Sequence, residues 1–189
     1  MSLSGKLIVF TAPSGSGKTT IVRHILSTFP ETAFSVSATT RPRRPHEVHG
    51  KDYFYLSAET FKLWIGYDAF IEWEEVYPDQ FYGTLRSEID RLHQIGKHVV
   101  FDVDVKGALN IKQLFPKETL SVFIKVPSME VLEERLRARG TETEESLQKR
   151  LVKARHELTY EEEFDAVLIN DDLNRTLAEA GDIVRKFLI

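Results

Sequence analysis

The chain has 189 residues, of which 42% are hydrophobic and 29% are charged, and its formal net charge is −4. This length is sufficient for one α/β domain with a sizeable core and a small insertion. The negative charge argues against a general nucleic-acid-binding protein, and the absence of cysteine excludes disulfides and thiolate metal sites. No apolar run resembles a signal peptide or approaches the roughly 20 residues that cross a bilayer. We therefore expect a cytoplasmic protein that binds neither nucleic acid nor membrane. We expect it to be a monomer or homodimer, a choice that the sequence does not decide.

The first predicted element is an apolar strand that leads through a glycine-rich loop into a helix over about 18–29. The loop, residues 12–19, reads Ala-Pro-Ser-Gly-Ser-Gly-Lys-Thr and fits the pattern G-x-x-x-x-G-K-[ST], except that Ala12 replaces the first glycine. The glycines allow successive N–H groups to surround an anion, Lys18 can bridge outer phosphates, and the Thr19 hydroxyl can ligate Mg²⁺. A glycine-rich turn without function is the alternative. The strand, loop, Lys-Thr pair and helix together favour a nucleoside triphosphate site.

The next part of the chain has a different character. An alternating strand over 34–37 leads into the basic loop Arg-Pro-Arg-Arg at 41–44, whose prolines exclude regular structure. From there to about residue 82 the chain is rich in aromatic residues and short strand-like segments, and Ser57 is suited to cap a brief helix. We predict a small mixed α/β subdomain over 37–83.

The second half of the chain alternates helices and strands. Thr84 is predicted to cap a helix, and a buried strand over 99–104 follows. The remaining predicted elements are a helix to 115, a strand over 120–126, helices over 128–139 and 143–160, a strand over 166–170 and a final amphipathic helix. Strands that alternate with helices imply a parallel sheet covered on both faces. We predict a three-layer α/β P-loop core over 1–36 and 84–189, within which residues 128–160 form a helical lid.

Two acids end the strand over 99–104. Asp102 has the position from which a P-loop protein orients Mg²⁺, and Asp104, two residues further, is expected to project from the same face of the strand. The alternative is an aspartate that caps the next helix. The nearby P-loop favours the functional interpretation of Asp102.

Arg41, Arg43 and Arg44 form a basic cluster that could be a solvated loop, a nucleic-acid patch or a phosphate clamp. Because the chain is acidic overall, we favour the clamp, in which the guanidinium fork matches phosphate oxygens. The flanking prolines stiffen this loop and lower the ordering cost of binding. The hydroxyls of Tyr53 and Tyr82 could complete such a site, although their spacing alone leaves this open.

Glu72 lies between large apolar residues in the sequence Phe-Ile-Glu-Trp at 70–73. A buried carboxylate needs a partner, and guanine offers two adjacent donors, N1–H and the 2-amino group, whereas adenine does not. Without other information, a carboxylate that points to solvent from an edge strand is the preferred interpretation.

Arg135 and Arg139 are four residues apart on one predicted helix and so share a face, and Arg150 follows on the next helix. Arginines around such a helix–turn–helix tip suit a mobile lid that closes over phosphates and excludes water. The alternative is that each arginine is exposed and paired with a nearby glutamate.

Together these segments resemble the guanylate kinase family over essentially the whole chain. The matching segments are 13–19, 35–43, 47–53, 70–73, 82–84, 102–107, 139–143 and 169–171. The resemblance implies a molecule of three parts: a core, a GMP-binding insertion and a lid. Ala12 departs from the family's usual glycine, and Thr84 stands where serine is common but keeps a hydroxyl.

The resemblance also implies roles for individual residues. The residues implied to bind GMP are Ser37, Arg41, Arg44, Tyr53, Glu72, Tyr82, Gly83, Thr84 and Asp104. Those implied to bind ATP are Pro13, Ser14, Gly15, Ser16, Gly17, Lys18, Thr19, Thr20 and Asn170. Those implied to act on the transferring group are Lys18, Arg41, Arg135, Arg139 and Arg150. Thr19 and Asp102 are expected to hold Mg²⁺.

These residues predict phosphoryl transfer from MgATP to GMP, or dGMP, with ATP and GMP as small-molecule substrates. The acceptor phosphate is already anionic, so alignment and charge stabilisation suffice. One alternative is a kinase for another phosphorylated acceptor, such as a ribose bisphosphate. Another is a protein-interaction module like the kinase-like domains of some scaffold proteins, which lack a working P-loop.

Overall fold

The computed structural model describes residues 5–138, 140 and 143–189. It separates into two compact units. Unit 1 comprises Met1–Gly5 and Glu31–Val99, and unit 2 comprises Lys6–Pro30 and Val100–Ile189. Unit 1 extends beyond residues 37–83 on both sides, and the bounds of the GMP-binding subdomain stay a prediction.

A five-stranded sheet has the order β2-β7-β1-β8-β9. Its strands are β1 (Leu7–Thr11), β2 (Thr32–Phe34), β7 (His98–Asp102), β8 (Thr119–Lys125) and β9 (Ala166–Ile169). By residue number, β1, β8 and β9 belong to unit 2, β2 belongs to unit 1 and β7 crosses the boundary. The β1–β8 and β8–β9 pairs are parallel, and every residue of β1 is buried. A continuous apolar run is what a parallel strand covered on both faces requires. The predicted α/β class with a mostly parallel sheet is confirmed.

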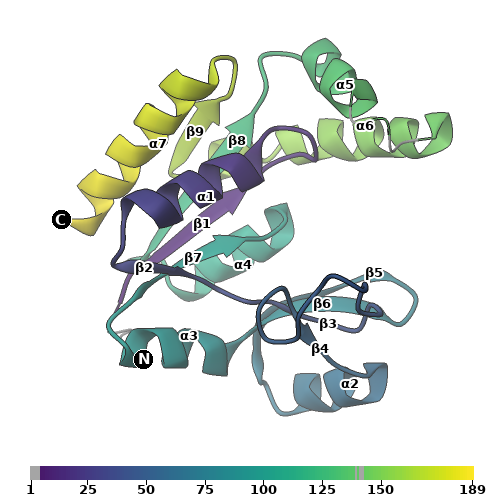
Figure 1. Ribbon diagram of the computed structural model, residues 1–189, viewed down its shortest axis with the longest axis vertical. Helices are drawn as coiled ribbons and strands as arrows, with labels where there is room; N and C mark the ends of the chain where they lie inside the picture. Colours follow the sequence, from purple (N-terminus) through teal and green to yellow (C-terminus); the bar gives the residue numbers. More distant parts are fainter. Residues whose placement is uncertain (1–4, 139, 141–142) are drawn as a thin grey trace. The chain divides into compact units, whose positions relative to one another are not determined.

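Helices of unit 2 cover this sheet and extend from it. They are α1 (Lys18–Thr28), α4 (Val105–Leu114), α5 (Met129–Ala138), α6 (Glu144–Leu158), the 3₁₀ helix η1 (Glu161–Glu163) and α7 (Leu173–Leu188). Figure 1 shows α1 beside α7, and α4 contacts both β1 and β8. Helices α5 and α6 pack against each other around a small core of their own, in which Leu136 and Leu147 are almost fully buried. This helix pair contains most of the predicted lid.

Unit 1 contains a four-stranded mixed sheet with the order β4-β3-β6-β5. Its elements are β3 (Ala38–Thr39), β4 (Phe54–Tyr55), α2 (Ala58–Gly66), β5 (Phe70–Tyr77), β6 (Gln80–Leu85) and α3 (Arg86–Gln94). Strands β3 and β4 are parallel, whereas β6 is antiparallel to both β3 and β5. Ser57 caps α2 as predicted, since its side chain accepts a hydrogen bond from the Thr60 N–H. Some of the aromatic residues of this segment, including Phe61, Phe70 and Phe81, form the core of this mixed α/β unit.

Three local expectations from the sequence are wrong. Thr84 caps no helix: it lies in β6, and α3 begins after Leu85 without a side-chain cap. The strand predicted over 34–37 ends at Phe34, and the Val36 N–H donates to the Glu88 carboxylate rather than to a neighbouring strand. The strand predicted over 99–104 ends at Asp102, because Asp104 caps α4 by accepting a hydrogen bond from the Gly107 N–H at 2.9 Å.

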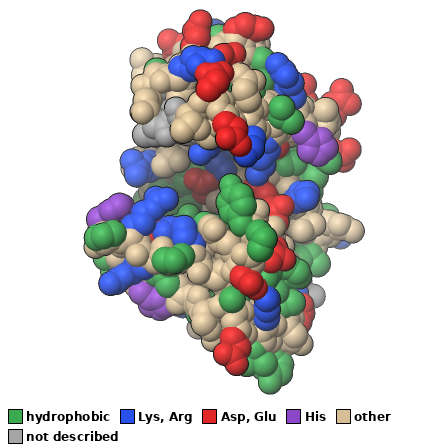
Figure 2. Space-filling model, turned by 90° about the vertical axis from the view of Figure 1, so that its right-hand side faces the viewer, with side chains coloured by type: hydrophobic (Ala, Val, Ile, Leu, Met, Phe, Trp, Pro, Cys, Tyr) green, Lys and Arg blue, Asp and Glu red, His purple; other side chains and the backbone are tan. Residues whose placement is uncertain are grey.

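The surface mixes charges of both signs. Figure 2 shows basic side chains beside acidic ones over the face in view, and exposed ion pairs include Lys62–Asp79 and Lys149–Glu145. Each such pair contributes at most about 1 kcal/mol to stability. In the described part of the chain, no helix has both the length and the apolar character needed to span a bilayer.

Replacement of Phe61 tests the core of unit 1. Phe61 is fully buried and stacks on Phe70 and Phe81, with ring centroids 4.2 and 5.3 Å away. Because Phe61→Ala leaves a cavity there, we expect the free energy of unfolding, measured by urea denaturation, to fall by about 3–5 kcal/mol. Leu63→Ala, on the same helix but at a side chain that is 54% exposed, should change it by no more than about 0.5 kcal/mol. Equal losses in both variants would contradict this core.

Candidate functional site

The loop after β1 has the backbone that its sequence predicts. Gly15 and Gly17 have φ angles of +100° and +90°, in the left-handed region that glycine adopts without steric cost. Gly17 is the N-cap of α1, and the Ser16 N–H donates to the Pro13 carbonyl at 3.1 Å. Among the described residues other than glycine, only two aspartates outside the loop have positive φ. Ala12 therefore fits its position, where its methyl group is buried.

Asn170, at the end of β9, holds this loop from one side. Its Nδ2 donates to the Ser16 carbonyl at 2.8 Å, and its own backbone N–H donates to the Lys125 carbonyl at 2.7 Å. The Asn170 side chain is buried and lies so close that a Cβ at Gly17 would collide with Nδ2. The family resemblance implies that Asn170 binds ATP. That role stays a prediction, and the structure adds a contact that supports the loop.

Lys18 and Asp102 form an ion pair that the sequence did not predict. The Lys18 ammonium lies 2.5 Å from an Asp102 carboxylate oxygen and donates to the Val103 carbonyl at 2.8 Å. Thr19 and Thr20 are exposed on the first turn of α1, which contains no acidic residue. The unpaired N–H groups and dipole of such a helix start favour an anion. The loop therefore combines a helix N-terminus, a lysine and a carboxylate.

Two of the three predicted lid arginines contact this region. The Arg150 Nη1 donates to the Ser14 hydroxyl at 2.7 Å, and the Arg135 Nη2 donates to the Asn170 carbonyl at 2.9 Å. Arg139 lies outside the described residues. The alternative of ordinary surface pairing holds instead for Arg137, which pairs with Glu133 and Glu144. In unit 2, Arg150 thus contacts the glycine loop, and Arg135 contacts the asparagine that supports the loop.

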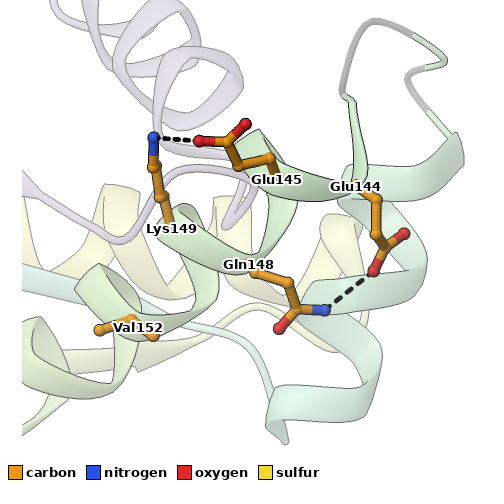
Figure 3. A pocket seen from close by; sticks show the side chains of 5 residues that line it. All are labelled: Glu144, Glu145, Gln148, Lys149 and Val152. Atoms are coloured by element: carbon orange, nitrogen blue, oxygen red, sulfur yellow. Dashed lines mark hydrogen bonds and ion pairs between the residues drawn. The ribbon is translucent and has the colours of Figure 1, made fainter.

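A shallow pocket lies on the surface of α6 (Figure 3). It is lined by Glu144, Glu145, Gln148, Lys149 and Val152. Its polar side chains form hydrogen bonds with one another: Lys149 donates to Glu145, and Gln148 donates to Glu144. Hydrogen bonds from Arg137 and Gln148 lower the pKa of Glu144 to about 2. Because one helix supplies the whole lining and its charges are already paired, we assign no ligand to this pocket.

Unit 1 places Glu72 opposite Thr84. The two residues are cross-strand neighbours on β5 and β6, and the buried Thr84 hydroxyl donates to Glu72 Oε1 at 2.5 Å. A Cβ at Gly83 would lie 2.8 Å from the Glu72 carbonyl oxygen, so only glycine allows this close approach. The interpretation of Glu72 as a carboxylate that simply points to solvent is therefore wrong, because it has a buried hydrogen-bond partner.

Arg41 is the centre of a second cluster in unit 1. Its Nη1 and Nη2 donate to the two oxygens of Glu47 at 2.9 and 2.8 Å. The guanidinium carbon lies 5.2 Å from the centroid of the Tyr53 ring and 5.8 Å from that of Tyr55, and the Tyr53 ring packs on that of Tyr82. The structure thus groups Arg41, Tyr53 and Tyr82 as predicted and adds Glu47 and Tyr55, which sequence reasoning missed.

Charge pairing dominates the electrostatics of this cluster. The hydrogen bond with Glu47 raises the pKa of Arg41, and the hydrogen bonds from Arg41 hold the pKa of Glu47 well below its usual range. Burial, followed by the bond to Glu47, raises the pKa of Tyr55, so its hydroxyl stays a donor. Glu47 lies six residues after Arg41 in the sequence, but this separation alone does not reveal the pair.

The other predicted residues occupy less enclosed positions. The Arg44 side chain is 64% exposed, while its backbone N–H donates to Glu47. Ser37 is half-buried, and its carbonyl accepts from the Phe54 N–H. Asp104 belongs to unit 2, whereas the other residues predicted to bind GMP belong to unit 1.

A parallel strand that ends in a left-handed glycine loop, followed by a helix beginning with lysine, defines a P-loop α/β kinase fold. The family model described as guanylate kinase matches residues 4–187. The chain belongs to the guanylate kinase family.

Individual relatives are similar to this chain over nearly its whole length. The guanylate kinase of Bacteroides thetaiotaomicron is 45% identical over 186 residues, which cover 98% of this chain and 91% of that protein. The guanylate kinase of Salinibacter ruber is 49% identical over 182 residues, or 96% of each chain. The crystal structure of guanylate kinase from Anaplasma phagocytophilum aligns with a TM-score of 0.74 at 28% identity, covering all of this chain and 88% of that one.

Substitution of Gly17 tests the geometry of the loop. Gly17→Ala places a methyl group at a positive φ and against the Asn170 amide. We expect affinity for a nucleoside triphosphate, measured by calorimetry, to fall at least about 10-fold, since a left-handed alanine costs about 1–2 kcal/mol even without a collision. The matched control is Gly181→Ala in α7, where the new Cβ would have no described atom within 4 Å apart from its chain neighbours and the backbone of the same helix. Unchanged binding by Gly17→Ala would contradict the described loop.

Proposed function

We propose that this protein transfers the γ-phosphoryl group of ATP to GMP, or to dGMP, and so forms ADP and GDP. The observation that carries the proposal is membership of the guanylate kinase family along 4–187, in a chain that keeps Lys18 of the loop and Glu72 of unit 1. The relatives named above are guanylate kinases. An interaction module without a working P-loop is disfavoured, because the Lys18–Asp102 arrangement is intact.

Unit 2 would bind the donor. The glycine loop and the start of α1 present N–H groups to the ATP phosphates, and Lys18 supplies a positive charge beside them. Arg150, already bonded to Ser14 of the loop, and Arg135 are suited to neutralise charge that develops on the transferring group. Arg139 is proposed to do the same on the strength of its position in the family motif.

Unit 1 would bind the acceptor. The Glu72 carboxylate, oriented by the Thr84 hydroxyl, can accept the two adjacent donors of guanine. Arg41 and the exposed Arg44 can contact the GMP phosphate, and the hydroxyls of Tyr53 and Tyr82 can add hydrogen bonds to it. Ser37 and Asp104 are proposed to contribute to recognition of the base. A carboxylate facing N1–H and the 2-amino group would disfavour adenine, which has an acceptor at N1.

No protein base is needed for this reaction, because the attacking oxygen belongs to a phosphate that is already anionic. The protein has to align the phosphates of ATP and GMP and to stabilise the charge on the transferring phosphoryl group. Cationic groups fixed before the reaction do this without reorganising at the moment of transfer. Lys18 and the arginines are such groups.

Magnesium fits the donor side. Thr19 offers a hydroxyl on the first turn of α1, and Asp102 offers a carboxylate beside Lys18. These oxygen donors suit Mg²⁺, which takes one or two protein ligands together with substrate phosphates and waters. When bound, the ion would neutralise phosphate charge and fix the geometry of the donor.

Three expectations accompany this proposal. We propose a cytoplasmic location, which agrees with the finding that no described helix could span a bilayer. We also propose ATP and GMP as the small-molecule substrates of the protein, with no nucleic-acid partner. Finally, we propose that it acts as a monomer or homodimer, which gel filtration with light scattering would decide.

An acceptor panel tests the proposed reaction. With MgATP as donor, we expect ADP release with GMP to exceed that with AMP or UMP by at least about 100-fold in kcat/KM, because a site built for paired donors leaves buried groups unsatisfied with other bases. Lys18→Ala should abolish turnover and so exclude a contaminating kinase. Equal rates with all three acceptors, or an acceptor preference for a sugar bisphosphate, would refute the proposal.

Substitution of Glu72 tests recognition of the base. Glu72→Gln replaces one acceptor oxygen by a donor NH₂, so we expect the KM for GMP to rise about 10- to 100-fold while the KM for ATP changes less than about 2-fold. Glu75→Gln on the same strand, where the side chain is exposed, is the matched control and should leave both values unchanged. Equal losses for GMP and ATP would show that Glu72 does not read the base.

A further inference from the structure

We infer that Glu47 is a positioning residue, which fixes the Arg41 guanidinium in the orientation that receives the phosphate of the acceptor. This inference rests on the proposed function, because it assumes that Arg41 contacts that phosphate. It adds a carboxylate to the phosphate-binding part of the acceptor site, which is otherwise described by its cations and hydroxyls.

Glu47 is buried in a way that an ordinary surface carboxylate is not. Its side chain is only 8% exposed, and it accepts four hydrogen bonds. Two come from Arg41, one at 2.8 Å from the Arg44 backbone N–H, and one at 2.8 Å from the Tyr55 hydroxyl. A buried carboxylate with this many donors is held firmly in its ionised form.

Two of these four donors are independent of the Arg41 side chain. The Arg44 N–H belongs to the loop itself, and the loop is closed by the Glu47 N–H, which donates to the Arg44 carbonyl at 3.1 Å. Tyr55 lies on β4, whose backbone pairs with β3. Glu47 is therefore anchored to the scaffold of unit 1, and Arg41 is anchored to Glu47.

The contact also leaves the arginine able to bind a second anion. A guanidinium has five N–H donors and more than one edge. Glu47 uses the edge formed by Nη1 and Nη2, and Nη1 also donates to the Pro42 carbonyl at 2.9 Å. Tyr82 is a further hydrogen-bond partner of the Arg41 side chain. The edge formed by Nε and Nη2 is separate from the one that Glu47 uses. A phosphate can contact that second edge without displacing the carboxylate. The Tyr53 and Tyr55 rings lie within 6 Å of the guanidinium carbon and restrict its movement further.

A different interpretation makes Glu47 a substitute for the phosphate, which must leave when the acceptor binds. The two interpretations predict opposite changes in affinity for the acceptor when Glu47 is removed. If Glu47 positions Arg41, its removal weakens binding, because the arginine must be ordered when the acceptor arrives. If Glu47 competes with the phosphate, its removal strengthens binding. The anchoring of Glu47 by Arg44 and Tyr55 favours the positioning role.

The test compares Glu47→Gln with the wild-type protein in steady-state kinetics. Glutamine keeps the shape but cannot accept both arms of the guanidinium, so we expect the KM for GMP to rise about 10-fold, with kcat and the KM for ATP within about 2-fold. Tyr55→Phe removes one anchor of Glu47 and should raise the KM for GMP less, about 2- to 5-fold. If Glu47→Gln does not fold, as judged by thermal melting, Tyr55→Phe alone decides the matter.

A double-mutant cycle establishes whether Glu47 acts through Arg41. Arg41→Lys keeps the charge but lacks the fork, so adding Glu47→Gln to it should change the KM for GMP less than about 2-fold. Additive effects, an unchanged KM for GMP in Glu47→Gln and Tyr55→Phe, or a lowered KM would each overturn the inference. Failure of the proposed function is distinct, because the wild-type protein would then not phosphorylate GMP at all.

Discussion

A cation held by a carboxylate is the arrangement on which each unit's predicted site depends. In unit 2 the pair is Lys18 and Asp102, 2.5 Å apart. In unit 1 it is Arg41 and Glu47, joined by two hydrogen bonds. Long basic side chains lose considerable rotamer entropy when they are ordered. Pairing with an acid fixes the cationic side chain before a phosphate binds, so binding loses less side-chain entropy.

The helices and strands around these two pairs also fix the side chains of the predicted sites in place. The buried strand β1 leads directly into the glycine loop, and α1 starts where the loop ends, so Lys18 lies at the helix N-terminus that favours an anion. Asn170 supports this loop from the end of β9. In unit 1, the antiparallel pairing of β5 and β6 brings Thr84 beside Glu72, which turns a strand carboxylate into an oriented acceptor.

The sequence predicts those features that depend on local chemistry. Gly15 and Gly17 have positive φ because the loop needs it, and the apolar runs became buried parallel strands. Features that depend on distant partners were harder to predict. Thr84 has the sequence context of a helix cap, but its hydroxyl bonds to its cross-strand partner Glu72. Asp104 continues an apolar run that predicts a strand, but it caps α4. No local sequence pattern marks Glu47, because its contacts with Tyr55 and Arg41 form only in the fold.

We expect the acceptor's phosphate to meet an Arg41 side chain that is already in place. A crystal structure of the protein with GMP bound would test this most directly. We predict that Glu47 keeps both contacts to the Arg41 guanidinium, while phosphate oxygens lie against the Nε edge. A structure in which Arg41 has turned away from Glu47 to reach the phosphate would contradict the account.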